Sequence, residues 1–359
     1  MNITVIGGGN IGTLMAAEFA AKGHAVTMFA SDPDSWSCRL EVLDAHDEPV
    51  CTGELSCVTA DLRRAVEGAH MIWVTYPTFM LEDLARDLIP LLDPSQWLGV
   101  VPGNDAEFIF SRHVESGGVL FGLQRVHSVA RIKKRGQSVY MLGRRTSGLH
   151  VAALPSARTA EVAQVVHDLF DLPVECLTTY LAETLTPSNP ILHTCRIFSM
   201  FRDWKPGVSY ERNLLFYEEW TDDASRTVLA CDAELQRVCH ALERLLGCDL
   251  SGVKSLLEHY ESEDASSMTA KIKSIPGFKG LLSPMIEDGS GRWVLDFESR
   301  YFKADFPFGL KAIRDIARLT DVPVPHMDEV YAWYSETAGD GRRFEAVPET
   351  LAKLAALYV

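Results

Sequence analysis

Short apolar runs alternate with helical patterns through the first half of the chain. Strands are predicted at residues 2–6, 25–30, 71–75 and 98–101, and helices at 13–22, 61–68 and 81–92. This alternation is typical of a parallel sheet covered by helices, because each parallel connection needs a crossover. The first half of the sequence therefore predicts a doubly wound α/β domain.

Helical spacing takes over after about residue 180, and strand-like runs disappear. Helices are predicted at 224–246, 252–260, 308–319 and 326–337, the first of them closed by Gly247 as a C-cap. A chain of 359 residues exceeds the size at which one hydrophobic core stops growing, so two domains are expected. We predict a nucleotide-binding domain at 1–180 and a mostly α-helical domain at 181–359.

A glycine-rich turn follows the first predicted strand. Its sequence is Gly7-Gly8-Gly9-Asn10-Ile11-Gly12, which places glycines at the three positions of GxGxxG. A lone match also fits a purely structural turn, but here a strand precedes it and a helix follows it, as in the Rossmann fold. The turn and the helix N-terminus would then hold a dinucleotide pyrophosphate, with contacts from Gly7, Gly9, Asn10, Ile11 and Gly12.

The end of the second predicted strand bears on the choice between NAD and NADP. Enzymes specific for NAD place an acidic residue there, whereas those specific for NADP have a small polar residue with a nearby arginine. Ala30 and Ser31 favour NADP, while Asp32 and the lack of a basic residue before Arg39 favour NAD. The sequence leaves both cofactors open.

The formal net charge of −15 and the hydrophobic fraction of 47% describe an acidic globular protein. Such a charge repels a phosphate backbone or an anionic bilayer, which excludes nucleic-acid and membrane-surface roles. No apolar run is long enough to span a bilayer, and Met1 runs directly into a strand, so we expect a cytoplasmic protein. The eight cysteines show no CxxC spacing and are interpreted as buried thiols, and no metal site is predicted.

Two segments of the second half are unusual for simple helix packing. Residues 186–193 are interrupted by prolines and end at His193, which by itself also fits a hydrogen-bonded core histidine. Residues 300–309 contain Arg300 and Asp305 before a proline and a glycine, which alone fits a surface turn with an ion pair. Together they supply a proton donor, its acidic partner and a fork for a carboxylate, the set that reduction of a C=O or C=N bond needs.

The sequence resembles the opine dehydrogenases of the octopine and nopaline type over nearly the whole chain. The similar segments are the glycine turn, residues 101–104, 130–133, 189–193 and 214–217, residues 249–251 with Val253 and Lys254, and Arg300 and Tyr301 with Asp305 and Gly309. This resemblance implies that His193 is the catalytic acid and base, Asp305 its partner and Arg300 the clamp on an α-keto acid. Such enzymes condense an α-keto acid, often pyruvate, with the amino group of an amino acid and reduce the Schiff base with NAD(P)H.

The resemblance also implies substrate contacts and shows where this chain differs. Asn104 matches a polar position near the keto acid, and Gln124 and His259 match a carboxylate and an aromatic residue that hold arginine. An amide and an imidazole give a weaker guanidinium site, so arginine is not the favoured substrate. Arg125, His127 and Arg131 are interpreted as structural or solvated residues.

Two alternatives remain open at this point. One is another two-domain NAD(P) reductase of the ketopantoate, glycerol-3-phosphate or hydroxyacid type, which would depend on a catalytic lysine. The other is a non-catalytic NAD(P)-binding redox sensor, which would not need His193, Arg300 and Asp305 together. The expected partners are the two small-molecule substrates, and the expected assembly is a monomer or homodimer.

Overall fold

A computed structural model describes residues 1–339 and 347–359. The chain divides into two compact units. The first unit consists of Met1–Thr184 together with Leu354–Val359, and the second unit consists of Leu185–Lys353.

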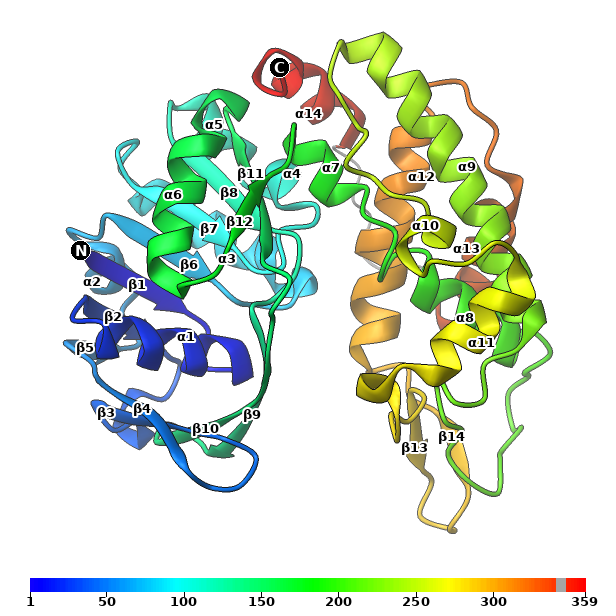
Figure 1. Cartoon of the computed structure of the whole chain (residues 1–359), viewed down its shortest axis with the longest axis horizontal. Coiled ribbons are helices and arrows are strands. Elements are labelled where there is room, and N and C mark those ends of the chain that lie inside the picture. The colour runs from blue at the N-terminus through cyan, green and yellow to red at the C-terminus, as the bar shows by residue number, and fades with distance from the viewer. Residues whose placement is uncertain (340–346) are drawn as a thin grey trace. The chain divides into compact units, whose positions relative to one another are not determined.

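An eight-stranded sheet forms the centre of the first unit, in the order β12-β11-β8-β7-β6-β1-β2-β5 (Figure 1). Its strands are β1 (Asn2–Ile6), β2 (Ala25–Phe29), β5 (Cys57–Thr59), β6 (Met71–Val74), β7 (Trp97–Val100), β8 (Val119–Leu123), β11 (Leu149–Leu154) and β12 (Val174–Cys176). β1 pairs in parallel with β2 and β6, whereas β11 is antiparallel to β8. The predicted doubly wound parallel sheet is confirmed, and the four predicted strands match β1, β2, β6 and β7 to within one residue.

Helices cover this sheet and share an aromatic core with it. They are α1 (Asn10–Ala21), α2 (Leu62–Val66), α3 (Leu81–Leu88), α4 (Ala106–Ile109), α5 (Ser111–Glu115), α6 (Thr159–Phe170) and α7 (Tyr180–Thr184). Phe19 of α1 meets Phe170 of α6 edge-on at 5.3 Å, and Trp73 of β6 meets Phe121 of β8 at 4.8 Å between ring centroids. Helix α1 begins three residues earlier than predicted, so its first turn includes the last glycine of the fingerprint.

A second sheet of the first unit was not predicted from the sequence. It has the order β4-β3-β10-β9, with β3 at Arg39–Leu43, β4 at Pro49–Glu54, β9 at Ser128–Lys134 and β10 at Ser138–Arg144. Charged, polar and apolar residues share the exposed positions of these strands, which include Val50, Val129 and Leu142, so the strands lack a clear apolar alternation. The sheet brings residues from two distant parts of the chain against α1.

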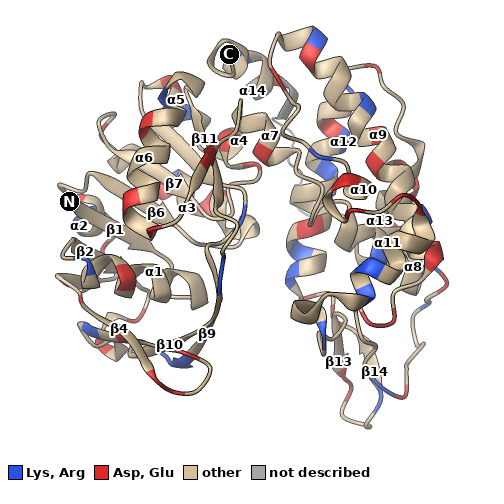
Figure 2. Cartoon of the chain, in the orientation of Figure 1, with Lys and Arg blue, Asp and Glu red and all other residues tan. Residues whose placement is uncertain are grey.

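The second unit is mostly helical, as predicted (Figure 1). Its helices are α8 (Leu192–Phe201), α9 (Asp222–Leu246), α10 (Leu256–His259), α11 (Ala265–Ser274), α12 (Lys311–Ala317) and α13 (Pro325–Ala338), and α14 (Val347–Leu354) leads back to the first unit. Helix α9 ends at Gly247, whose φ of 70° confirms the predicted C-cap. Acidic and basic residues are interspersed along α9, consistent with a solvated outer face (Figure 2).

Three predictions for the second half of the chain and for the cysteines are wrong in part. Strands do occur after residue 180, as the short antiparallel pair β13 (Met285–Glu287) and β14 (Trp293–Leu295). Residues predicted as a surface turn form a π-helix, η6 (Tyr301–Leu310), because Gly309 packs against Pro190 and Pro307 cannot donate a helical hydrogen bond. The thiols of Cys38 and Cys176 are exposed rather than buried.

Short 3₁₀ turns join several of these elements. They are η1 (Pro33–Ser35), η2 (Thr78–Met80), η3 (Ile89–Leu91), η4 (Ser156–Arg158), η5 (Pro276–Phe278) and η7 (Ala355–Leu357). The helix predicted at 81–92 ends early in η3, where Pro90 lacks the N–H that an α-helix would use.

Candidate cofactor and active sites

The glycine turn is shaped by close backbone packing. Gly7 has a φ of 121°, and its N–H donates to the carbonyl of Phe29 at 3.4 Å, which places the turn beside the end of β2. A Cβ on Gly12 would lie 1.8 Å from the carbonyl oxygen of Gly7, whereas a Cβ on Gly9 would meet no atom within 4 Å. The open space at Gly9 beside the N-terminus of α1 fits a dinucleotide pyrophosphate.

Asn10 and Ile11 hold the start of α1 in place. The side-chain oxygen of Asn10 accepts a hydrogen bond from the backbone N–H of Ile132 in β9 at 2.8 Å. Ile11 packs against the core of the first unit. Both side chains are therefore engaged within the protein, and these residues can offer a cofactor their backbone N–H groups.

The end of β2 places Ala30 and Ser31 next to the glycine turn. Ala30 is buried, while Ser31, Asp32 and Asp34 are exposed. Trp36 covers the adjacent surface, because a Cβ on Gly8 would lie 2.4 Å from its indole ring. The region therefore combines an aromatic wall with two exposed carboxylates.

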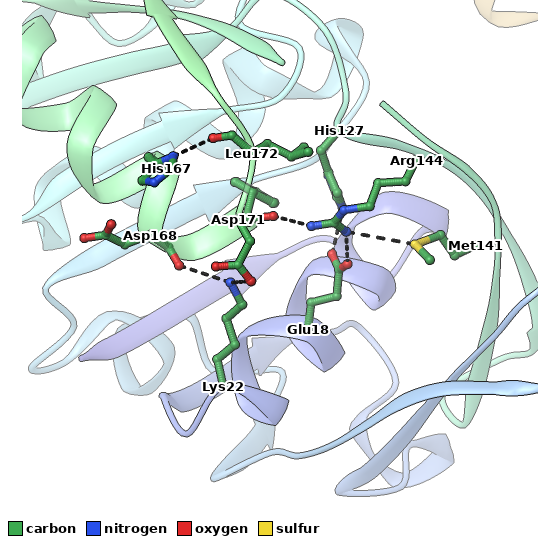
Figure 3. Close-up of polar contacts among 10 residues, drawn as sticks. Glu18, Lys22, His127, Met141, Arg144, His167, Asp168, Asp171 and Leu172 are labelled. Carbon is green, nitrogen blue, oxygen red and sulfur yellow. Dashed lines mark hydrogen bonds and ion pairs between the residues drawn. The ribbon is translucent and has the colours of Figure 1, made fainter. Parts of the chain in front are cut away.

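A charged cluster fastens α1 to the second sheet (Figure 3). Glu18 accepts from Arg144 at 2.6 Å and contacts the ring nitrogen of His127 at 2.7 Å. Burial raises the pKa of Glu18, but the hydrogen bonds and charges of His127 and Arg144 outweigh this and lower it overall. Nearby, Lys22 pairs with Asp171 at 2.6 Å, also visible in Figure 3. His127 therefore has the structural environment expected from the sequence.

Three buried acidic residues lie beyond the end of β7. Asn104 donates to the backbone carbonyl of Glu183 at 2.9 Å, and the Thr184 hydroxyl lies 2.7 Å from the Glu107 carboxyl group. Burial raises the pKa of Glu107 to about 8, and burial together with the charge of Glu107 raises those of Asp105 and Glu183. The carboxyl of Glu107 is therefore largely protonated at neutral pH, and the side chain of Asn104 is held by α7.

The second unit brings His193 and Asp305 together across 112 positions of sequence. His193 Nδ1 lies 2.9 Å from Asp305 Oδ2, and the side chains are 6% and 11% exposed. His193 is the second residue of α8, and Asp305 lies in η6. The contact between Gly309 and Pro190 packs these two segments against each other. A histidine oriented by a carboxylate at Nδ1 can accept and return a proton at Nε2.

Arg300 lies directly before η6 and is exposed, with its guanidinium carbon 5.3 Å from the centre of the Tyr301 ring. Partial desolvation of the guanidinium by neighbouring groups lowers the pKa of Arg300, but attraction by Asp305 and Tyr301 outweighs this and raises the pKa overall. No ion pair within 4.0 Å joins Arg300 to Asp305 in the described chain, so the alternative interpretation of this segment as a surface turn with an ion pair does not hold. The guanidinium therefore lies over the Tyr301 ring and within the electrostatic influence of Asp305.

The two residues that match the family's guanidinium site lie in different units. Gln124 follows β8 in the first unit, and its backbone N–H donates to the His150 carbonyl at 3.1 Å. His259 ends α10 in the second unit, and its ring lies edge-on to Tyr260 at 4.9 Å.

Tyr217 was not selected as a site residue from the sequence. Its hydroxyl lies 3.0 Å from His193 Nε2, so this histidine has a partner at each ring nitrogen. The resemblance included residues 214–217, but a tyrosine inside an apolar segment gives no signal for a contact with a histidine 24 positions earlier.

Within 1–339 and 347–359, no group of three or more His, Cys, Asp or Glu side chains could hold a metal ion. None of the helices in those ranges is both long and apolar enough to cross a membrane.

Comparison with known proteins matches two parts of the chain to two family models. Residues 176–338 match the family described as NAD/NADP octopine/nopaline dehydrogenase, alpha-helical domain, and residues 2–101 match the N-terminus of NAD-dependent glycerol-3-phosphate dehydrogenase. An opine dehydrogenase from Haliotis discus hannai is 26% identical over 370 residues, which cover 94% of this chain and 90% of the relative. A tauropine dehydrogenase from Arabella iricolor is also 26% identical, over 94% of this chain and 91% of its own.

A solved octopine dehydrogenase structure with NADH and pyruvate shares the fold. Its TM-score is 0.83 at 21% identity, covering 97% of this chain and 93% of that one. The helical-domain match and two relatives that align over nearly the full length show that the chain is similar to the opine dehydrogenases, and they support an NAD(P)-dependent oxidoreductase acting on CH–NH bonds.

Proposed function

We propose that the protein joins an α-keto acid, with pyruvate as the first candidate, to the amino group of an amino acid. The observation that carries this proposal is the buried His193–Asp305 pair, close to an arginine held by Tyr301. The names of the relatives and the pyruvate in the octopine dehydrogenase structure support the substrate class. Arginine is not the favoured amino acid, because Gln124 and His259 supply no carboxylate for a guanidinium.

In the proposed reaction, the amine nitrogen bonds to the keto carbon, and water leaves to give a protonated imine as one proton is taken up from solvent. Bound NAD(P)H supplies the hydride that reduces the imine carbon. His193 accepts the proton released by the amine and provides one for the departing oxygen, while Asp305 holds its Nδ1 and stabilises the imidazolium. The residues of this chain thus supply proton transfer and orientation.

Arg300 is proposed to bind the carboxylate of the keto acid through its planar fork. Asn104 is proposed to contact the same substrate. One N–H of its side-chain amide is already anchored to the Glu183 carbonyl, which leaves the second N–H to donate to an oxygen of the keto acid.

The cofactor is proposed to lie on the glycine turn, with Gly7, Gly9, Asn10, Ile11 and Gly12 at its pyrophosphate. Ala30 and Ser31 would then lie at the adenosine ribose. The exposed carboxylates of Asp32 and Asp34 would repel a 2′-phosphate, so we expect NADH to be preferred over NADPH.

We further propose that residues 1–180 form the cofactor-binding domain, which also supplies Asn104, and that residues 181–359 form the substrate domain with the His193–Asp305 pair and Arg300. A cytoplasmic location and a monomer or homodimer are proposed on the acidic composition.

A matrix assay of keto acids against amino acids, with NADH and with NADPH, tests the proposed function. Oxidation of the cofactor should require both substrates and should be faster with NADH. Equal turnover with a keto acid alone would instead identify a hydroxyacid dehydrogenase, which is the main alternative reading.

A further inference from the structure

Both ring nitrogens of His193 are engaged inside the second unit. Asp305 holds Nδ1 at 2.9 Å, and the hydroxyl of Tyr217 lies 3.0 Å from Nε2. His193 and Tyr217 are each only 5% exposed. A proton that enters or leaves Nε2 therefore meets the Tyr217 hydroxyl first.

Tyr217 is fixed by aromatic packing rather than by a flexible loop. Its ring stacks on Phe278 with centroids 3.9 Å apart, and it lies parallel to Trp220 at 6.1 Å. The segment before it is anchored, because Arg196 of α8 donates to the carbonyl of Phe216 at 2.9 Å. Helix α8 thus carries both His193 and the arginine that positions the neighbour of Tyr217.

Tyr217 can serve both protonation states of His193. Burial raises the pKa of Tyr217, so its hydroxyl keeps its proton at neutral pH. When Nδ1–H donates to Asp305, neutral His193 accepts from the Tyr217 hydroxyl at Nε2. When His193 is an imidazolium, Nε2–H donates to the same oxygen instead. The other ionisable groups that act on Tyr217 are Tyr301, Tyr260, Arg300 and Asp305.

We propose that the Tyr217 hydroxyl relays the proton between His193 and the substrate. This inference rests on the proposed function and adds a residue to it. As the Nε2 proton of His193 moves to the Tyr217 oxygen, the hydroxyl proton of Tyr217 passes to the leaving oxygen of the substrate. One proton leaves the imidazolium, one reaches the substrate, and no tyrosinate forms.

Tyr217→Phe tests the relay because it keeps the stacked ring and removes only the hydroxyl. Tyr210→Phe is the matched control, since Tyr210 also lies in an aromatic contact of the second unit, with Phe201 at 5.7 Å. The rate of NADH oxidation in a single turnover should fall roughly 10²-fold in Tyr217→Phe, the low end for general acid–base catalysis. The affinity for NADH should not change, and the control should keep the wild-type rate.

A proton inventory in mixtures of H₂O and D₂O separates a relay from a structural role. A plot of the wild-type rate against the D₂O fraction should be curved, because two protons move together. The same plot for the residual rate of Tyr217→Phe should be a straight line. A Tyr217→Phe rate within about threefold of wild type, with only a lower melting temperature, would overturn the relay.

The contact itself can be measured without turnover. The ¹⁵N resonance of His193 Nε2 should shift in Tyr217→Phe and stay constant in Tyr210→Phe. An unchanged resonance would refute the contact. A different outcome is that the resonance shifts but no combination of a keto acid and an amino acid supports NADH oxidation by the wild-type enzyme. The proposed function and the relay then both fail, although the Tyr217–His193 contact stands.

Discussion

The glycine turn of the first unit and the His193 site of the second are built in opposite ways. The turn consists of six consecutive residues, and its shape depends on the absence of side chains at Gly7 and Gly12. The His193 site gathers side chains from three separate segments and buries them among aromatic rings. A cofactor-binding turn can thus be specified by a few consecutive residues whose backbone forms the site, whereas the proton-transfer site requires packing between residues far apart in the sequence.

The largest effect is expected from His193→Ala. It should lower kcat by roughly 10²–10⁴-fold, because it removes the acid and base, while the Kd for NADH stays nearly unchanged. Asp305→Asn should act in the same direction but less strongly. Steady-state kinetics measures kcat, and fluorescence titration measures the Kd for NADH. A large change in Kd would contradict the claim that the glycine turn binds the cofactor independently of the His193 site.

Arg300→Lys should have the next largest effect. Lysine keeps the charge but loses the planar fork, so kcat/KM for the keto acid should fall roughly tenfold to a hundredfold, as expected for a charged hydrogen bond of about 1.5–3 kcal/mol. The KM for the amino acid should change much less. Equal increases in both KM values, together with a lower melting temperature, would make Arg300 a structural residue.

Two glycines of the turn should respond differently to alanine. Gly9→Ala should leave the melting temperature unchanged and weaken NADH binding by roughly tenfold, because its Cβ enters open space needed by the pyrophosphate. Gly12→Ala should lower the melting temperature, because its Cβ would lie 1.8 Å from the Gly7 carbonyl oxygen. Calorimetry and NADH titration check both, and identical behaviour of the variants would contradict the assigned geometry.

The smallest effect concerns the pH dependence of stability. Because the folded pKa of Glu107 is about 8 against 4.5 normally, its contribution is fully present below about pH 4.5 and is lost as the pH rises toward 8. Glu107→Gln stays neutral, so its melting temperature relative to wild type should rise by a few degrees from pH 5 to pH 8. Parallel pH profiles for the two proteins would show that Glu107 is not protonated in the folded state.

Local features of the fold could be predicted from the sequence. The four predicted strands and the glycine turn have strong apolar periodicity and punctuation over few residues. The second sheet was missed because β3, β4, β9 and β10 mix polar, charged and exposed apolar residues, and contact with α1 contributes to their buried face. The π-helix was missed because proline and glycine normally indicate a turn, and burial against Pro190 overrides that preference.

The candidate site was predicted in the same uneven way. Periodicity alone left His193 as an ordinary core histidine, and family resemblance supplied its pairing with Asp305, which the structure now shows at 2.9 Å. Neither approach selected Tyr217. Its contact depends on stacking against Phe278, which lies 61 positions later in the sequence, and no short motif records such packing. The roles of these residues stay predictions until they are tested.

Isotope labelling of the product tests the central claim most directly. The enzyme would be incubated with pyruvate, a mixture of ¹⁵N-labelled amino acids and NADH carrying deuterium on both hydrogens at C4, and the product analysed by mass spectrometry. The account predicts a secondary amine that contains one ¹⁵N atom from the amino acid and one deuterium on the former keto carbon. Deuterated lactate without nitrogen, formed at the same rate whether or not amino acids are present, would contradict it.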